Sequence, residues 1–212
     1  MAVDPSDWRT YLVTQESVSA GRSTLEIVDA ALEGGIDVVQ LREKEMSARE
    51  RYGLGQALRD RTTRAGVPLL VNDRVDLALA LEADGVHVGQ SDLPVAVARE
   101  LLGPGRIVGC SASTVSEAKQ AESDGADYLG VGAVYGTSSK DVDPDEDGVG
   151  PERIATIVDA VSIPVIGIGG ITADIAQPVR EAGAAGVAVI SEITMADDPR
   201  AATERLATAC RQ

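Results

Sequence analysis

The sequence predicts an α/β fold, a single (β/α)8 TIM barrel that spans residues 1–212 as one catalytic domain. Two observations predict this fold. Short apolar runs rich in β-branched residues recur along the chain, and a longer segment with helical periodicity follows each of them. The alternation occurs eight times within 212 residues, which is close to the lower size limit of the fold. Because Phe is absent, the core must consist mainly of Val, Ile, Leu and Ala.

The expected strands are the eight short apolar runs, which are bounded by turn-forming residues. They are Tyr11–Thr14, Asp37–Leu41, Pro68–Asn72, Gly85–Val88, Arg106–Cys110, Tyr128–Gly132, Pro164–Ile168 and Gly186–Ile190. The expected helices are the intervening segments, whose apolar residues recur at helical spacing. They are Thr24–Glu33, Ala48–Arg64, Val75–Glu82, Val95–Leu102, Ser116–Ser123, Pro151–Ala160, Asp174–Glu181 and Pro199–Ala209.

Similar turns precede four of the strands. Glycine after a helix adopts the left-handed conformation that ends it. The four turns are Gly35-Ile36-Asp37, Ala83-Asp84-Gly85-Val86, Gly125-Ala126-Asp127 and Gly183-Ala184-Ala185-Gly186-Val187. A doubly wound sheet is the competing fold, but it usually has fewer strands and a glycine-rich turn after the first one. Here Thr14-Gln15-Glu16 follows the first strand, which favours the barrel.

The charge balance excludes some partners. Asp and Glu number 34 against 19 Lys and Arg, a net charge of −15. Such a surface repels nucleic acid and anionic membranes, so neither is an expected partner. Only Lys44, Lys119 and Lys140 are lysines, and an acidic surface with so few lysines fits a protein kept soluble in high salt. An ordinary acidic cytosolic protein is the alternative.

The remaining composition indicates a cytoplasmic protein. Cys110 and Cys210 have neither a disulfide pattern nor metal-ligand spacing. The first residues lack a basic start followed by an apolar run, and no apolar stretch is long enough to cross a membrane. We therefore expect a cytoplasmic location and small-molecule substrates, with a homo-oligomer possible.

Charged side chains gather where the predicted strands end, which is where barrel enzymes have their active sites. Alternation directs Gln40, Arg42 and Lys44 toward the barrel axis if Leu41 faces the helices. Cations against an acidic background indicate an anionic ligand such as a phosphate or diphosphate. Asp73 and Asp92 at neighbouring ends indicate Mg²⁺, which one or two carboxylates hold together with phosphate oxygens. The alternative is a set of salt bridges between strand ends.

A second anion site is expected after the last two strands. Gly169-Gly170 and Ile190-Ser191 are positioned for the phosphate site common in this fold, where backbone N–H groups bind the anion. The acidic stretch Asp141–Gly150 is either a surface loop or a mobile lid over the barrel mouth. His87 lies inside a predicted strand, which favours a structural role over that of a catalytic base.

Taken together, these segments resemble the thiamine-phosphate synthase family over almost the whole chain. The matching segments are Tyr11-Leu12-Val13-Thr14, Gln40-Leu41-Arg42-Glu43-Lys44, Asn72-Asp73-Arg74, His87–Asp92, Cys110–Thr114, Gly130–Lys140, Gly167–Ile171 and Val189–Ile193. The resemblance implies an enzyme that joins a hydroxymethylpyrimidine diphosphate to a thiazole phosphate and releases pyrophosphate and thiamine phosphate. Gly136 and Ser139 stand where the family usually has Pro and Thr.

The resemblance also implies residue roles. For the pyrimidine diphosphate it implies Gln40, Leu41, Arg42, Glu43, Lys44 and Asn72, with Ser111 at the pyrimidine end and Lys140 at the diphosphate. Asp73 and Asp92 are the implied Mg²⁺ ligands. For the thiazole phosphate it implies Thr137, Ser138, Ser139, Gly170, Ile190 and Ser191. The implied catalytic residues are Lys140, Arg42, Lys44 and Ser111.

The absence of an evident base fits this reaction, because the thiazole nitrogen is already a nucleophile and positioning with charge stabilisation would suffice. Two alternative functions remain open. A thiazole tautomerase would need a general base, and it would not need the residues that bind a diphosphate. A non-catalytic phosphate sensor on the same scaffold would bind the thiazole phosphate without turnover.

Overall fold

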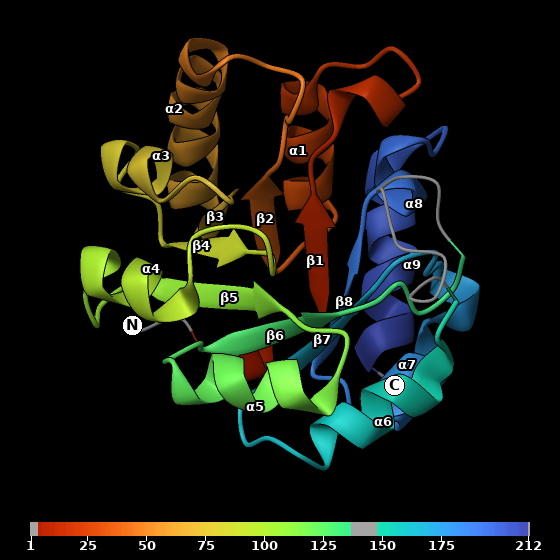
Figure 1. The fold of residues 1–212 in the computed structure, drawn as a ribbon. Coiled ribbons are helices and arrows are strands. Elements are labelled where there is room, and N and C mark those ends of the chain that lie inside the picture. The colour runs from red at the N-terminus through yellow and green to blue at the C-terminus, as the bar shows by residue number, and fades with distance from the viewer. Residues whose placement is uncertain (1–3, 137–147, 212) are drawn as a thin grey trace.

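Eight parallel strands form a closed barrel in the computed structural model, which describes residues 4–136 and 148–211. Each strand pairs with its neighbour along the chain, and β8 closes the ring by pairing with β1. The strands form the inner ring and the helices the outer one (Figure 1). The strands are β1 Thr10–Val13, β2 Val38–Leu41, β3 Leu69–Asn72, β4 Gly85–Val88, β5 Ile107–Ser111, β6 Tyr128–Val131, β7 Val165–Ile168 and β8 Gly186–Val189. The predicted fold class is therefore confirmed.

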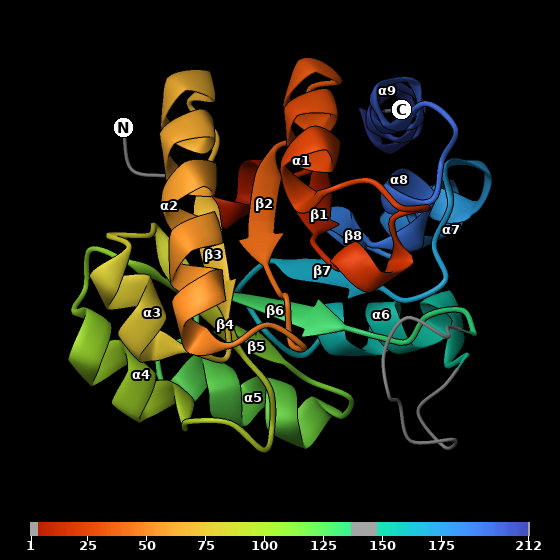
Figure 2. The ribbon, with the colours of Figure 1, turned by 90° about the horizontal axis from the view of Figure 1, so that it is seen from above.

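Three of the outer helices, α1, α2 and α5, begin at side chains that cap them. Ser23 with Glu26 and Ser47 with Glu50 form capping boxes at the first two helices, which satisfy N–H groups that have no partner within the helix. Figure 2 shows α1 and α2 side by side outside β1 and β2. The helices are α1 Thr24–Glu33, α2 Ala48–Ala65, α3 Val75–Ala80, α4 Val95–Leu102, α5 Val115–Ser123, α6 Gly150–Val158, α7 Ala176–Glu181, α8 Ser191–Thr194 and α9 Pro199–Arg211. Short 3-10 turns cover Pro5–Asp7, Glu16–Val18 and Ala173–Ile175.

The predicted boundaries agree at α1, α4 and β4 and differ elsewhere by one or a few residues. The segment expected as one helix over Asp174–Glu181 is a 3-10 turn followed by α7. The short α8 was not predicted at all. Four residues make a single turn, which is too short to produce a helical period in the sequence.

Two apolar layers hold the barrel together, because strand side chains alternate between the helices and the axis. On the outer side, Leu41, Leu58 and Leu81 are part of the large cluster between strands and helices. The inner cluster is smaller and contains Trp8 and Tyr128. The two ring centroids lie 5.1 Å apart in an edge-to-face arrangement, so aromatic rings fill the axis of a largely aliphatic protein.

Aspartates in three of the predicted turns bind the neighbouring strand at the amino-terminal end of the barrel. Each precedes an even-numbered strand and accepts a hydrogen bond from a backbone N–H of the strand before it. The bonds run from Thr10 to Asp37 (2.9 Å), from Leu69 to Asp84 (2.8 Å) and from Val108 to Asp127 (2.7 Å). These carboxylates lie at the end of the barrel opposite the expected site, and their function is to stabilise the fold.

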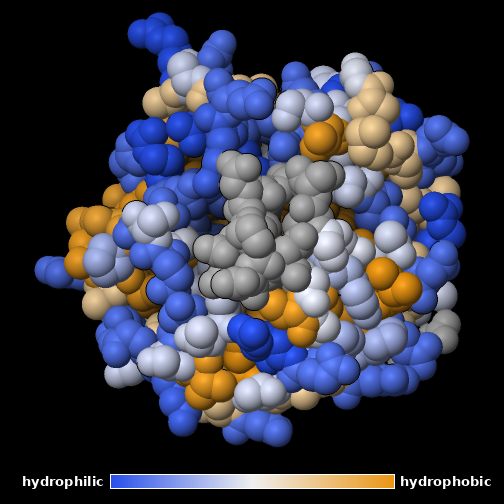
Figure 3. Space-filling view, turned by 45° about the vertical axis from the view of Figure 1, so that its right-hand side comes forward, coloured by the Kyte–Doolittle hydropathy of each residue, from blue (hydrophilic) through white to orange (hydrophobic). Residues whose placement is uncertain are grey.

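The acidic composition is visible on the surface. Figure 3 shows a face on which hydrophilic residues dominate and hydrophobic residues form only small groups. Across the described ranges, helices are either too short or too polar to traverse a bilayer.

Candidate active site

The carboxyl ends of β2 and β3 bring a cation and a carboxylate together. Lys44 Nζ lies 3.1 Å from Asp73 Oδ2, and about half of the lysine side chain is exposed. The Asp73 backbone has a φ of 62°, a left-handed conformation that is uncommon outside glycine. Its N–H donates to the His87 carbonyl at 2.8 Å, which fixes the turn after β3. The backbone is thus held in an unfavourable conformation at a predicted site residue, as occurs at functional sites.

Asp92 from the loop after β4 joins this pair. Its carboxylate acts on that of Asp73 and accepts the Gly89 N–H at 2.8 Å. Burial raises the pKa of the Asp73 carboxyl, and Asp92 raises this pKa further, while Lys44 opposes both effects. Two interacting carboxylates, of which one pairs with a cation, are an arrangement that additional positive charge would stabilise.

A metal site with three protein ligands is not found within residues 4–136 and 148–211. The two carboxylates of Asp73 and Asp92 still fit Mg²⁺. This ion keeps several waters and uses one or two carboxylates together with the phosphate oxygens of a substrate. The protein part of such a site needs no third ligand.

Asn72 presents an unpartnered donor beside this cluster. Asn72 is the last residue of β3, and it is 7% exposed. Because Val71 before it belongs to the outer cluster, alternation directs the Asn72 side chain toward the barrel axis. Within the described part of the chain, its Nδ2 has no hydrogen-bond partner. A buried donor without a partner costs about 1–3 kcal/mol, a cost that a ligand acceptor would remove.

Arg42 is held by the loop after β1. Its Nη1 donates to Gln15 Oε1 at 3.0 Å, and its backbone N–H donates to Thr14 Oγ1 at 3.1 Å. Gln40, two residues earlier, is buried at 3% exposure and donates through Nε2 to the Tyr11 hydroxyl at 2.6 Å. The alternation predicted for β2 therefore places Gln40 inside the barrel.

Leu41 and Glu43 have side chains that serve the scaffold. Leu41 is buried in the outer cluster, on the helix side of β2. The Glu43 carboxylate accepts the Glu16 N–H at 2.8 Å and the Thr24 hydroxyl at 2.9 Å, which ties the loop after β1 to α1. A ligand contact predicted for either residue would have to use its backbone.

The predicted phosphate segments lie together at the ends of β7 and β8. The Ala173 N–H donates to the Glu192 carboxylate at 3.1 Å, which joins the loop after β7 to α8. Gly169 and Gly170 have φ values of 99° and 64°. A Cβ on Gly170 would lie 2.6 Å from the Gly136 carbonyl oxygen, so a side chain is excluded there. Backbone groups therefore dominate the surface of this loop.

Four predicted site residues, Thr137, Ser138, Ser139 and Lys140, lie outside the described residues, as does most of the acidic stretch Asp141–Gly150. The described residues on either side are close together, since a Cβ on Gly148 would lie 3.9 Å from the Gly136 nitrogen. Tyr135 N–H also donates to the Gly169 carbonyl at 3.0 Å. Gly136 and Tyr135 thus lie beside the glycines after β7, with Gly148 close to Gly136.

Sequence reasoning missed a buried polar chain beneath the site. The Tyr11 and Tyr128 hydroxyls lie 2.9 Å apart, Tyr128 Oη lies 2.9 Å from His87 Nδ1, and His87 Nε2 lies 3.0 Å from Ser111 Oγ. The alternation of side chains along each strand was the signal that could have revealed this chain. Applied to Tyr11 and Tyr128, it places both phenols on the axis, although it gives no distance between them.

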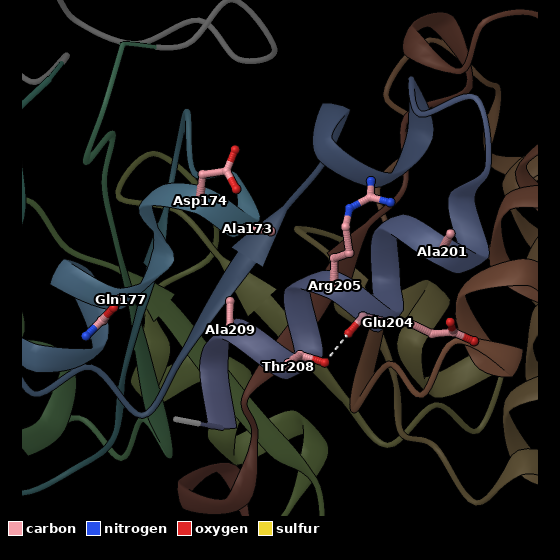
Figure 4. A pocket seen from close by; sticks show the side chains of 8 residues that line it. All are labelled: Ala173, Asp174, Gln177, Ala201, Glu204, Arg205, Thr208 and Ala209. Carbon is pink, nitrogen blue, oxygen red and sulfur yellow. Dashed lines mark hydrogen bonds between the residues drawn. The ribbon is translucent and has the colours of Figure 1, made fainter.

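A groove of about 550 Å³ lies on the outside of the barrel, between the start of α7 and α9 (Figure 4). Asp174 and Gln177 line one side, and Glu204, Arg205 and Thr208 line the other. None of these residues belongs to the predicted site.

These observations define a class, a (β/α)8 barrel whose carboxyl end combines cations, carboxylates and, among the described residues, one buried amide donor without a partner, a set suited to an anionic ligand. The family model described as thiamine monophosphate synthase matches residues 10–193, and the chain belongs to this family. The thiamine-phosphate synthase of Natronomonas pharaonis is 61% identical over 203 residues, which cover 96% of this chain and 95% of that protein. That of Haloquadratum walsbyi is 63% identical over 198 residues, 93% and 89% of the two chains. A solved thiamine phosphate pyrophosphorylase from Pyrococcus furiosus has 40% identity and a TM-score of 0.89, and covers 98% of this chain and 97% of that one.

Proposed function

We propose that this chain is a transferase of thiamine biosynthesis. It joins 4-amino-2-methyl-5-(diphosphooxymethyl)pyrimidine to a thiazole phosphate and forms thiamine phosphate and pyrophosphate. The family match and the relatives named thiamine-phosphate synthase support this activity. One structural observation carries it, namely the contact of Lys44 with Asp73, whose carboxylate interacts with Asp92 and whose neighbour Asn72 has an amide donor without a partner among the described residues.

The cations act on the leaving group. A diphosphate on a primary carbon departs only when its developing negative charge is stabilised. Arg42 and Lys44 follow β2 on the same side of the barrel mouth as Asp73, and Lys140 is the third cation in this proposal. Asn72 Nδ2 donates to a diphosphate oxygen and thereby gains the partner that it otherwise lacks.

Asp73 and Asp92 are the residues that would hold Mg²⁺. When bound, Mg²⁺ would add positive charge for the diphosphate to that of the side chains. Lys44 contacts Asp73, which orients that carboxylate and keeps the ammonium group next to the diphosphate.

The reaction needs no general base from the chain. The bond between the methylene carbon and the diphosphate oxygen breaks, and its electron pair leaves with pyrophosphate. The electron-rich aminopyrimidine stabilises the resulting cation while Gln40 and Ser111 hold the ring. The thiazole nitrogen then donates its lone pair to the methylene carbon. Positioning of this kind supplies up to about 7–11 kcal/mol in favourable cases.

The thiazole phosphate binds on the opposite side of the mouth, at Gly170, Ile190 and Ser191 together with Thr137, Ser138 and Ser139. The positive φ and the close packing of Gly170 support a contact through the backbone, since no side chain covers its N–H. We further propose that the whole chain is one catalytic domain, that it acts in the cytoplasm on small molecules, and that it can form a homo-oligomer.

The test is to incubate the protein with both phosphorylated substrates, with and without Mg²⁺ and at low and high KCl. Formation of thiamine phosphate and pyrophosphate in equal amounts supports the proposal. Binding of the thiazole phosphate without product would favour the sensor, and isomerisation of the thiazole without pyrophosphate release would favour the tautomerase.

A further inference from the structure

The buried polar chain inside the barrel connects two predicted ligand-binding residues. It runs from Gln40 through Tyr11, Tyr128 and His87 to Ser111, and each step is a hydrogen bond of 2.6–3.0 Å. Gln40, Tyr11, Tyr128 and His87 are all at least nine-tenths buried. Ser111, the last residue of β5, is the one member that is half-buried and reaches the mouth.

The direction of the protons along this chain follows from its first donor. Gln40 Nε2 donates to Tyr11 Oη, so the Tyr11 hydroxyl must direct its own proton elsewhere. Within the described part of the chain, its other partner is Tyr128 Oη. Tyr128 thus accepts from Tyr11 and donates to His87 Nδ1. A neutral histidine that accepts at Nδ1 carries its proton on Nε2, which faces Ser111 Oγ.

We propose that His87 and Tyr128 are positioning residues that orient the Ser111 hydroxyl as a hydrogen-bond donor toward the substrate in the mouth. Ser111 Oγ accepts from His87 Nε2–H and therefore turns its own proton away from the histidine. A ring nitrogen of the pyrimidine is the kind of acceptor that such a hydroxyl recognises. This statement about the ligand rests on the proposed function, whereas the tautomer of His87 does not.

The barrel is built around this chain. An added Cβ on Gly109 would overlap the Tyr128 ring, and one on Gly130 would lie 3.0 Å from His87 Cε1. Glycines in the neighbouring strands thus provide the space that the two rings occupy. Burial raises the pKa of Tyr11 and of Tyr128, so both phenols keep the protons that the chain requires.

Nitrogen-15 NMR tests the tautomer directly, because His87 is the one histidine in the sequence and its imidazole signals need no assignment. We expect the wild-type protein at neutral pH to carry the proton on Nε2. Tyr128→Phe removes the donor to Nδ1 and shifts the tautomer toward Nδ1–H. Tyr11→Phe removes the hydroxyl that directs the Tyr128 proton but keeps the Tyr128 donor to His87, so we expect a smaller shift of the tautomer than in Tyr128→Phe.

A double-mutant cycle tests whether Tyr128 acts through Ser111. We expect Tyr128→Phe to lower kcat/KM for the pyrimidine diphosphate about ten-fold, the effect of one misdirected hydrogen bond. Ser111→Ala removes the group that Tyr128 orients, so adding Tyr128→Phe to Ser111→Ala should change kcat/KM less than two-fold. A purely structural tyrosine would give additive losses.

The two proposals fail in different ways. An active wild-type enzyme with the proton on Nδ1, or with additive losses in the cycle, overturns the positioning role and leaves the proposed function intact. A wild-type protein that forms no thiamine phosphate overturns the proposed function, and with it the ligand contact of Ser111. Thermal melting of each variant, within a few degrees of wild type, ensures that the comparison is between folded proteins.

Discussion

At the scale of single residues, the site combines groups that destabilise the folded protein when no ligand is bound. Asn72 buries an amide donor without a partner among the described residues, and Asp73 holds a left-handed backbone next to a second carboxylate. Both arrangements cost free energy in the unliganded fold. The proposed diphosphate would supply an acceptor to Asn72, and the proposed Mg²⁺ would supply positive charge to Asp73 and Asp92.

Asn72→Ala distinguishes a role of this amide in ligand binding from a role in stability. The variant loses a donor to the diphosphate but also loses the cost of a buried unpaired group. We therefore expect KM for the pyrimidine diphosphate to rise about ten-fold while the melting temperature stays within a few degrees of wild type. A large drop in melting temperature with unchanged KM would indicate that the amide serves the scaffold.

Lys140→Ala tests the third cation. The variant removes one positive charge that would stabilise the pyrophosphate as it leaves, and we expect turnover to fall at least about 100-fold. Steady-state kinetics with both substrates measure this loss. Near-normal turnover would refute the role assigned to Lys140.

Part of the site could be predicted from strand alternation and part could not. Alternation correctly placed Gln40 inward and Leu41 outward on β2. It could not foresee that the Glu43 carboxylate is used by Glu16 and Thr24, because those partners come from a different loop. The chain from Tyr11 to Ser111 was missed for the same reason, since its distances depend on the register of strands that are far apart in the sequence.

At the scale of elements, glycines within strands have packing roles that the sequence alone does not reveal. Gly109→Ala puts a methyl group into the Tyr128 ring, and we expect a loss of about 1–3 kcal/mol in the free energy of unfolding. Gly53→Ala is the matched control, because nothing lies within 4 Å of its added Cβ in the middle of α2. That variant should gain about 0.5–1 kcal/mol.

Chemical denaturation of both variants checks this pair of expectations. Equal stability of Gly109→Ala and wild type would mean that Tyr128 can move aside, and that the polar chain is less rigid than inferred.

The elements themselves were predictable where local signals are strong. The capped helix α1 and the amphipathic α4 begin and end as the sequence indicates. The four-residue α8 has no periodicity to detect, and the 3-10 turn before α7 was read as part of the helix. Both misses lie in loops at the carboxyl ends of strands, where backbone geometry depends on neighbouring loops.

At the scale of the whole molecule, the regular alternation of strands and helices was sufficient to predict a closed barrel. The same alternation did not predict which side chains fill the axis of the barrel. Trp8 lies before β1 in a segment without strand pattern, and it packs on Tyr11 and Tyr128 only once the barrel has closed.

The net charge of −15 predicts a stability that depends on salt. Repulsion among carboxylates weakens as counter-ions screen it, so the melting temperature should rise between low salt and roughly 2 M KCl. Differential scanning calorimetry at several KCl concentrations measures this. A melting temperature that falls steadily with KCl would argue against adaptation to high salt.

The most direct test of the central claim is a Mg²⁺ titration of pyrophosphate release with both substrates present. We expect release to rise with Mg²⁺ and to saturate, and Asp73→Asn to require at least about ten times more metal. Asp76→Asn, which removes a nearby carboxylate that pairs with Arg74, should leave the titration unchanged. Pyrophosphate release that is independent of divalent cations, or identical titrations for wild type and Asp73→Asn, would contradict a metal-binding carboxylate pair at the barrel mouth.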